Sequence, residues 1–241
     1  MDNNLNKGFY KDLDTNFAIA YDLCAKNFSK EELLVMLKTG NIPEKQIAAL
    51  NLNCVTSIEE ASLLLSNLTG CDGKIREAVA LRIFSLCSQS DEMRKLFSSL
   101  DPKVFADATV DINANICRYV VDTVLLFKDN STFAEKYSAY ILNIAYLALE
   151  ELDKFIFRDK KYVINKQLFK LYWCLEALKF FYEYISPNDL ENLVKISIKQ
   201  NEYTIREKVA QIIVNLQGFT EAKSLLKNDE NYYVRVAMLN H

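Results

Sequence analysis

Side chains that could act as acids, bases or nucleophiles are sparse in this 241-residue chain. Its single histidine is the last residue, His241, so the body of the chain lacks the group that most often moves protons near neutral pH. Adjacent acids such as Glu59 and Glu60 point about 100° apart on a helix and are typical of first helical turns, where they complement the helix dipole. Because no titratable groups converge, the sequence predicts no catalytic residue and indicates a protein that is not an enzyme.

Cysteine spacing gives little support to a metal or cofactor site. The six cysteines form no Cys-x-x-Cys pair, and the one histidine is the last residue, so a Cys/His zinc site has no support. No phosphate-binding loop or dinucleotide fingerprint is present, so we expect no metal and no cofactor. Cys71 lies in a turn and is predicted to be the most reactive thiol. Four others lie among aliphatic residues and are expected in the core: Cys54, Cys87, Cys117 and Cys174.

Aromatic and basic residues are concentrated between Lys154 and Tyr184. Rings interleaved with cations can stack bases and hold phosphates, which is the pattern of a nucleic-acid surface. The same rings at helical spacing are also consistent with a protein-binding patch, or with a helix packed between two neighbours. We interpret the stretch as a core helix, with Leu171 and Leu175 facing one neighbour and Trp173 facing another.

Composition places the chain among helical globular proteins. Hydrophobic residues make up 50% and charged residues 25%, and five glycines and three prolines are too few for the frequent turns of a β-sandwich or barrel. The net charge of −3 gives no general attraction to nucleic acid. The N-terminus does not read as a signal peptide, and the longest apolar stretch is shorter than the roughly 20 residues that cross a membrane. We therefore expect a cytoplasmic protein with free thiols and no membrane contact.

Helix starts are marked by capping residues and prolines. Ser29 with Glu32, Ser57 with Glu60, and Thr132 with Glu135 have the spacing of capping boxes, and Pro43, Pro102 and Pro187 each fit a first helical turn. These marks predict an N-terminal helix near 9–27, followed by antiparallel pairs. The pairs are 30–39 with 43–54, 58–67 with 74–88, 91–109 with 112–128, 132–155 with 165–185, 188–200 with 202–216, and 220–227 with 230–240.

One short pattern occurs three times, as an aliphatic residue and Arg followed by a small residue and more aliphatics. It begins at Ile75-Arg76, at Ile205-Arg206 and, in shorter form, at Val234-Arg235. On a helix its apolar positions line one face, the Arg lies at the edge of that face, and the small Ala lets another helix come close. This pattern resembles the inner helix of a HEAT repeat.

The chain thus resembles a HEAT-repeat, armadillo-type α-solenoid. The resemblance implies an all-α fold, namely a right-handed α-α superhelix of antiparallel helix pairs. A capping helix is expected over 1–28 and a single solenoid domain of about six pairs over 29–241. HEAT repeats often place an Asp six residues before the repeat's Arg, which forms a ladder of hydrogen bonds between turns, and Asp229 and Arg235 keep this spacing.

The spacing of the aliphatic anchors indicates compact repeats. We expect the buried anchors of successive inner helices at Ile42, Ile75, Ile112, Ile205 and Val234. The long interval between the third and fourth anchors holds either one large repeat or a seam between two sub-solenoids. We favour the large repeat because no linker rich in Gly, Pro or Ser occurs in the chain.

Stacked repeats of this kind usually bind partners on a concave strip formed by the inner helices. The candidate partner-binding residues are therefore the polar positions of those helices: Arg76, Arg82, Asn115, Arg118, Lys166, Lys170, Arg206, Lys208 and Gln211. Because this strip leans basic, an acidic peptide or helix is a plausible guest. The hypothesis is a non-enzymatic interaction or scaffold module that binds a partner protein or peptide.

The alternative hypothesis is a nucleic-acid-binding protein of the DNA-alkylation-repeat glycosylase type. Those enzymes resemble this chain in architecture and length, but their groove is basic and aromatic-lined and carries a catalytic carboxylate. No acid of this sequence matches their motif, so nucleic acid is disfavoured as a partner.

The C-terminal segment has the inner-helix pattern but few residues after it. Tyr233, Val236 and Leu239 belong to an apolar set with no following repeat to cover it. This edge is either shielded by its own tyrosines or docks a partner or a second copy of the chain, and the sequence slightly favours the shielded form.

Overall fold

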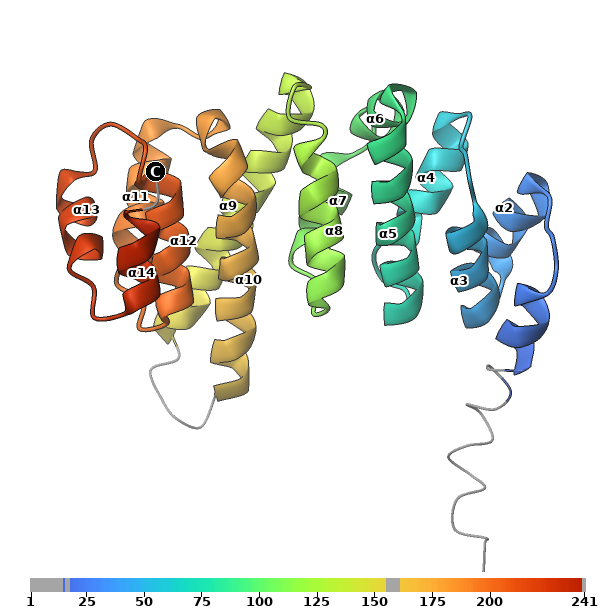
Figure 1. The fold of residues 1–241 in the computed structure, drawn as a ribbon, viewed down its shortest axis with the longest axis horizontal. Coiled ribbons are helices and arrows are strands. Elements are labelled where there is room, and N and C mark those ends of the chain that lie inside the picture. Colours follow the sequence, from blue (N-terminus) through green and yellow to red (C-terminus); the bar gives the residue numbers. More distant parts are fainter. Residues whose placement is uncertain (1–14, 16–17, 155–160, 240–241) are drawn as a thin grey trace, which may run out of the picture. The chain divides into compact units, whose positions relative to one another are not determined.

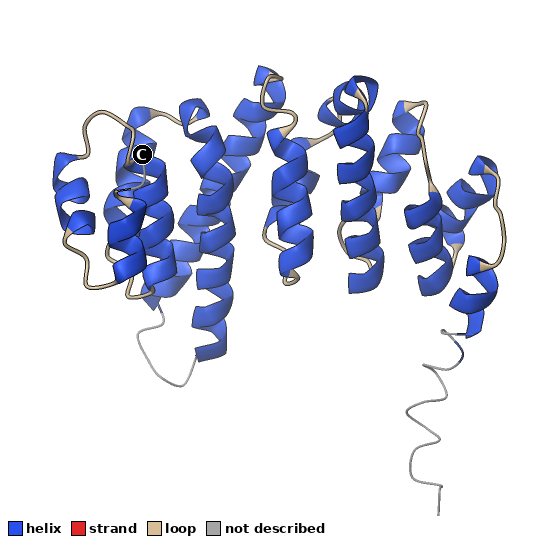
Figure 2. Ribbon diagram, in the orientation of Figure 1, coloured by secondary structure: helices blue, strands red, loops and turns tan. Residues whose placement is uncertain are grey.

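The computed structural model describes residues 15, 18–154 and 161–239. Within these residues the secondary structure is entirely helical, without any strand, which confirms the all-α prediction (Figure 2). None of the described helices is both long and apolar enough to cross a lipid bilayer. The expected capping helix over 1–28 lies largely outside the described residues, although 18–24 are helical.

The described chain divides into two compact units, residues 1–104 and 105–241, and each is described by itself. In the first unit α3 packs on both α2 and α5, and α4 contacts α2 and α6, so helices two apart in sequence lie side by side (Figure 1). Its helices are α2 (Lys30–Thr39), α3 (Ile42–Asn51), α4 (Ile58–Ser66), α5 (Gly73–Gln89) and α6 (Asp91–Ser98), with α7 (Pro102–Thr109) beginning here and continuing into the second unit.

The second unit repeats this arrangement in two layers. In one layer α10 packs on α8 and α12, and α12 packs on α14; in the other α9 contacts α11 (Figure 1). Its helices after α7 are α8 (Ala114–Leu125), α9 (Ser131–Lys154), α10 (Lys161–Phe181), the short 3-10 helix η2 (Tyr182–Tyr184), α11 (Pro187–Ser197), α12 (Tyr203–Ile213), α13 (Thr220–Lys227) and α14 (Tyr232–Ala237).

Most of the expected helix starts are confirmed. Ser29 and Glu32 form a reciprocal capping box at α2, and the three prolines occupy the first turns of α3, α7 and α11. The box expected at Thr132 is wrong, because the Asn130 side chain accepts from the Phe133 N–H and the helix already begins at Ser131. An asparagine two residues before Thr132 therefore caps this helix instead.

The core of the second unit is built around aromatic rings. Phe133 contacts Phe105, Phe127 and Tyr137, with ring centroids 5.2–5.8 Å apart. The Tyr137 hydroxyl is fully buried and lies 2.8 Å from the Thr109 hydroxyl, which in turn donates to the Phe105 carbonyl. This pairing satisfies the phenol inside an apolar core, where an unpaired hydroxyl would be costly.

The helix α10 confirms the interpretation of the aromatic stretch as core in part, because Phe169, Tyr172 and Phe180 are only half-buried. It packs on α9 and on α12, and Leu171, Cys174 and Leu175 are fully buried, with Trp173 exposed by only 7%. A helix with neighbours on both sides must be apolar on both sides, which explains why its hydrophobic residues cover most of its circumference.

The cysteine assignments hold in part. Cys87, Cys117 and Cys174 are buried as expected. Cys54 is exposed, because α3 ends at Asn51 and leaves Cys54 in the loop before α4 rather than on a helix face. Cys71 is half-buried, and its thiol lies 3.6 Å from the Asn67 side-chain oxygen. The expectation that Cys71 is the most accessible thiol is therefore wrong.

Candidate partner-binding surface

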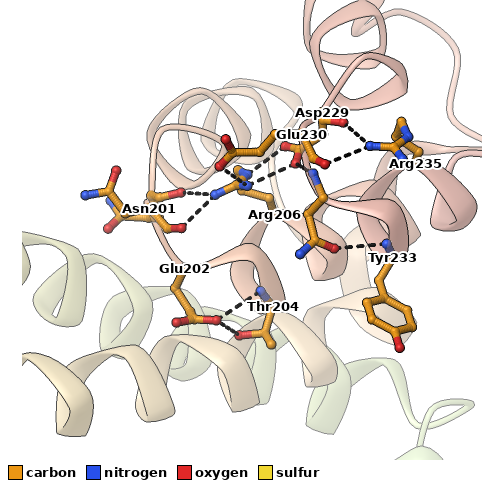
Figure 3. Close-up of polar contacts among 10 residues, drawn as sticks. Asn201, Glu202, Thr204, Arg206, Asp229, Glu230, Tyr233 and Arg235 are labelled. Atoms are coloured by element: carbon orange, nitrogen blue, oxygen red, sulfur yellow. Dashed lines mark hydrogen bonds and ion pairs between the residues drawn. The ribbon is translucent and has the colours of Figure 1, made fainter.

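The Arg of the repeated pattern fixes the loop before its own helix. Arg206, near the start of α12, donates through Nη1 to the carbonyls of Gln200 and Asn201, both at 2.8 Å (Figure 3). Its other nitrogens form a bidentate pair with Asp229, Nε to Oδ2 at 2.7 Å and Nη2 to Oδ1 at 2.9 Å. The side chain is only 8% exposed. Arg206 therefore joins the start of α12 to the loop before α14.

The same loop closure recurs at every copy of the pattern. Arg235 donates to the carbonyls of Asp229 and Glu230, at 2.6 and 2.9 Å (Figure 3). Arg76 donates to the carbonyl of Cys71. In each case the acceptors lie five or six residues before the Arg. These guanidinium groups are thus structural, and they are held against backbone rather than presented to a partner.

The structure also reveals a fourth copy that the sequence pattern hides. The Cys117 thiol of α8 donates to the Asp111 carbonyl at 3.0 Å, six residues back, in the position that Arg holds elsewhere. The residue before it, Ile116, is fully buried, as are Ile75, Ile205 and Val234 at 0–4% exposure. The anchors expected at Ile112 and Ile42 are wrong, since these residues are 77% and 40% exposed.

The residue four positions before the Arg or Cys caps the helix. The side chains of Asp72, Asn113, Glu202 and Asn231 each accept from the backbone N–H two residues further on. In two of the copies an Asp lies six positions before the Arg or Cys and stabilises this cap. Oδ1 of Asp111 and of Asp229 accepts from the backbone N–H of the capping residue at 2.9 and 2.8 Å. Asp229 also pairs with Arg206 of α12.

The hydrogen bonds between Arg206 and Asp229 shift the pKa values of both side chains. The hydrogen bonds from Arg206 hold the pKa of Asp229 below its usual range, although burial acts in the opposite direction. The same bonds raise the pKa of Arg206, against the effect of burial. Both groups therefore stay charged wherever the protein is folded near neutral pH.

The nine candidate residues fall into two sets. Arg82 donates to the Ala49 carbonyl at 3.0 Å, and burial lowers its pKa. With Arg76, Arg206 and Lys208, four of the seven cationic candidates that made the strip look basic are bonded within the protein. Asn115, Arg118 and Lys166 are exposed, whereas Lys170 and Gln211 are half-buried. The argument for an acidic guest is weakened accordingly.

Lys208 belongs to a charged network between α10 and α12. Its Nζ lies 2.6 Å from Oε2 of Glu176, whose other oxygen is 2.7 Å from Nζ of Lys179. The Lys208 ammonium also lies 5.0 Å from the ring centroid of Tyr172 and donates to Gln211 at 3.2 Å. The network is partly buried, with side-chain exposures of 11% for Lys208 and 17% for Glu176.

The pKa values in the network reflect this pairing. Burial raises the pKa of Glu176, but the hydrogen bonds from Lys179 and Lys208 outweigh it and leave the pKa below the usual range. Burial lowers the pKa of Lys208, and its bond to Glu176 more than compensates, so the net shift is upward. Both partners are therefore ionised, and with Lys179 the network joins one carboxylate to two ammonium groups at the centre of the α10–α12 face.

Two hollows flank this network along α10 and α12. The first, the aromatic hollow, has a volume of about 410 Å³ and is lined by Ala114, Asn165, Leu168, Phe169, Tyr172, Trp173, Glu202 and Thr204. The second, about 440 Å³, is lined by Lys179, Phe180, Tyr182, Gln211, Ile212, Asn215 and Leu216. We call the two hollows and the Glu176–Lys208 pair between them the α10–α12 groove.

Another hollow, about 640 Å³, lies between α11 and α13 beside Phe219, a residue with left-handed backbone (φ 54°).

Sequence reasoning found part of this groove. Lys208, Gln211 and Asn215 were expected on it, but Glu176 and Phe180 were not among the candidates. Glu176 and Lys179 are three residues apart on α10, a spacing that indicates a helix-surface ion pair and nothing more. Only the packing of α10 on α12 brings Lys208 to them.

Comparisons with known proteins leave the chain without a family. No protein family model matches it, and no curated protein matches it. Its fold is similar to the crystal structure of an engineered protein from a structural genomics consortium, with a TM-score of 0.48 and 13% sequence identity over 88% of this chain and 94% of that chain. A similarity at this level supports no conclusion about function. Among the described residues no cluster of three or more His, Cys, Asp or Glu side chains is arranged to hold a metal ion.

Proposed function

We propose that this protein is a non-enzymatic interaction module that binds a partner protein or peptide along the α10–α12 groove. The proposal includes the finer architecture expected from sequence, a right-handed HEAT-like solenoid whose inner helices are α8, α10, α12 and α14. Two features support that architecture: helices two apart in sequence pack together, and each copy of the Arg or Cys pattern closes its own loop. These are the expected properties of stacked repeats.

The observation that carries the function is the two hollows on either side of an internally paired charge network. Early residues of both helices line the first hollow and late residues of both line the second, so α10 and α12 run in the same direction. Phe169 and Phe180, one in each hollow, are about 16 Å apart along the α10 axis at 1.5 Å per residue. Concave, mostly apolar sites with a few polar groups are the usual form of binding sites. A helix or extended segment that places one side chain in each hollow would fit this spacing.

The internal pairing of the charges favours a protein partner over nucleic acid. Binding to a phosphate backbone depends on several unpaired cations along one face. At the centre of the groove Lys208 and Lys179 are both bonded to Glu176, so these ammonium groups are not available for phosphates without breaking that network.

The test blocks the second hollow without disturbing the core. Asn215 is exposed and lines that hollow, so Asn215→Arg should obstruct it, while Asn143→Arg, at an exposed position of α9, makes the same change outside the groove. Wild type and both variants are used to capture proteins from the source lysate, with quantification by mass spectrometry. We expect at least one captured protein to be lost with Asn215→Arg and retained with Asn143→Arg.

Two results would overturn the proposal. One is capture that is the same for all three proteins, which would place any binding outside the groove. The other is micromolar affinity for short duplex or single-stranded DNA that falls steeply with salt, which would favour the nucleic-acid alternative.

A further inference from the structure

The aromatic hollow combines rings set at right angles with a carboxylate. The ring of Trp173 lies edge-on to that of Tyr172, with centroids 5.4 Å apart and planes at 87°, and to that of Phe169 at 6.3 Å and 67°. Phe169 and Tyr172 are half-buried and supply most of the exposed ring surface. The Nε1 atom of Trp173 is fully buried and has no acceptor among the described residues, so the exposed part of this side chain does not include its N–H group. Trp173 therefore presents ring carbon to the hollow rather than its polar edge.

Glu202 sets the charge of this hollow. Of the described residues that line it, Glu202 is the one with a charged side chain. Its Oε1 caps α12 through long contacts with Thr204, 3.5 Å to the backbone nitrogen and 3.3 Å to the hydroxyl, so the carboxylate keeps most of its capacity to accept. Two cations of α12 have other partners, since Lys208 is bonded to Glu176 and Arg206 to Asp229, and Arg206 also feels the charge of Glu202.

One ring of the hollow already holds a cation. The ammonium group of Lys208 lies 5.0 Å from the Tyr172 centroid, within the range of a cation–π interaction. Perpendicular aromatic rings with a nearby carboxylate are the arrangement that recognises alkylammonium groups, because the ring faces attract the positive charge and the apolar methylenes are buried against them.

We propose that the aromatic hollow binds an alkylammonium group, the side chain of a lysine or N-methylated lysine on the partner. The inference rests on the proposed function, because it names the side chain that one end of the α10–α12 groove holds. A carboxylate or phosphate is disfavoured by the charge of Glu202. A purely aliphatic side chain would fill the volume but would bury Glu202 without a counter-charge.

The experiment uses the full chain and two small probes. The first is blocked trimethyl-lysine, and the second is its uncharged analogue in which carbon replaces the ammonium nitrogen. Both are titrated to millimolar concentration while the fluorescence of Trp173, the only tryptophan, and its indole N–H resonance are followed. We expect the cation to bind at least about tenfold more tightly than the neutral analogue, with an affinity that falls as salt is added.

A charge variant separates the electrostatic contribution from apolar burial. Glu202→Gln keeps the oxygen that caps α12 but removes the charge, and it should weaken the cation about five- to tenfold while leaving the neutral analogue unchanged. Glu135→Gln, at an exposed position of α9, removes the same charge away from the hollow and should have no effect. Because neither change touches the core, both variants should fold.

The outcomes are distinguishable from those of the capture experiment. Equal binding of the two probes, equal weakening of both by Glu202→Gln, or no perturbation of Trp173 by either probe would each overturn the inference. If a captured partner still depends on the Asn215 position in those cases, the proposed function stands and only the identity of the guest side chain is wrong.

Discussion

The bidentate pair between Arg206 and Asp229 should be among the strongest single contributors to the stability of the second unit. Each side chain is only 9% exposed, and the two hydrogen bonds measure 2.7 and 2.9 Å. Asp229→Ala removes both bonds and the brace to the Asn231 N–H, and it leaves the guanidinium with carbonyl acceptors and the longer ion pair to exposed Glu230 at 3.6 Å. Removing one partner of a buried pair costs about 3–5 kcal/mol. We expect about 3 kcal/mol here, since the pair lies in a loop region at the edge of the fold.

The assay is denaturant unfolding followed by circular dichroism, with hydrogen exchange to locate the effect. For a chain of this size a loss of 3 kcal/mol corresponds to a fall in melting temperature of about 6–12 °C. Protection should be lost first in α14, because the pair connects the loop before α14 to α12. A double-mutant cycle with Arg206→Met should give a coupling energy of about 2 kcal/mol.

An exposed ion pair provides the matched control. Lys195 and Glu191 of α11 are 2.6 Å apart, but their side chains are 60% and 52% exposed. Glu191→Ala should cost less than about 1 kcal/mol, because water and salt screen such pairs. If Asp229→Ala costs no more than this control, or if the cycle gives no coupling, then the pair is not the connection that its geometry indicates.

Three further predictions concern pH, thiols and the core. The pKa values of Asp229 and Glu176 are both held below their usual range. Their stabilising effect is therefore complete above about pH 5 and is lost as pH falls through the lowered values. The stability of the double variant Asp229→Asn, Glu176→Gln, measured by unfolding, should depend less steeply on pH between about pH 5 and 3. In native alkylation mapped by mass spectrometry, exposed Cys54 should react well before Cys117, whose pKa is raised to about 12 by burial, and equal labelling would contradict this order. Tyr137→Phe removes one buried hydroxyl bond and should lower the urea midpoint by an amount equivalent to about 1 kcal/mol, whereas an unchanged midpoint would mean that this bond makes no net contribution.

The helical fold could be predicted because each helix start is specified by residues close to it in the sequence. The Ser29 box, the first-turn prolines and the apolar periodicity all act within a few residues, and each agrees with the structure. Errors arose where two local signals competed. Asn130 and Thr132 both have capping side chains, and nothing in the sequence ranks them. At α8 a cysteine, Cys117, stands where the other copies of the pattern have Arg. The buried anchor of this helix was therefore assigned to Ile112, which is exposed.

The candidate surface was less predictable because it depends on pairs far apart in sequence. From sequence alone, a lysine on a helix is interpreted as a solvated cation. Lys208 contacts Glu176 only because α12 packs on α10. The Arg residues of the repeated pattern were misread for a similar reason. Their acceptors are backbone carbonyls, which every residue carries and no sequence pattern displays.

The loop closures described above also set an order of assembly. The contact from Arg206 to Asn201 spans 5 residues, whereas the contact from Arg206 to Asp229 spans 23. By the logarithmic dependence of closure entropy on length, the longer contact costs about 1.4 kcal/mol more to close in a flexible chain. The short contacts can therefore form before the helices pack on one another. They fix the residues at which α12 and α14 start. Packing between neighbours then joins segments whose ends are already set, so a shifted helix register is disfavoured before any long-range contact forms.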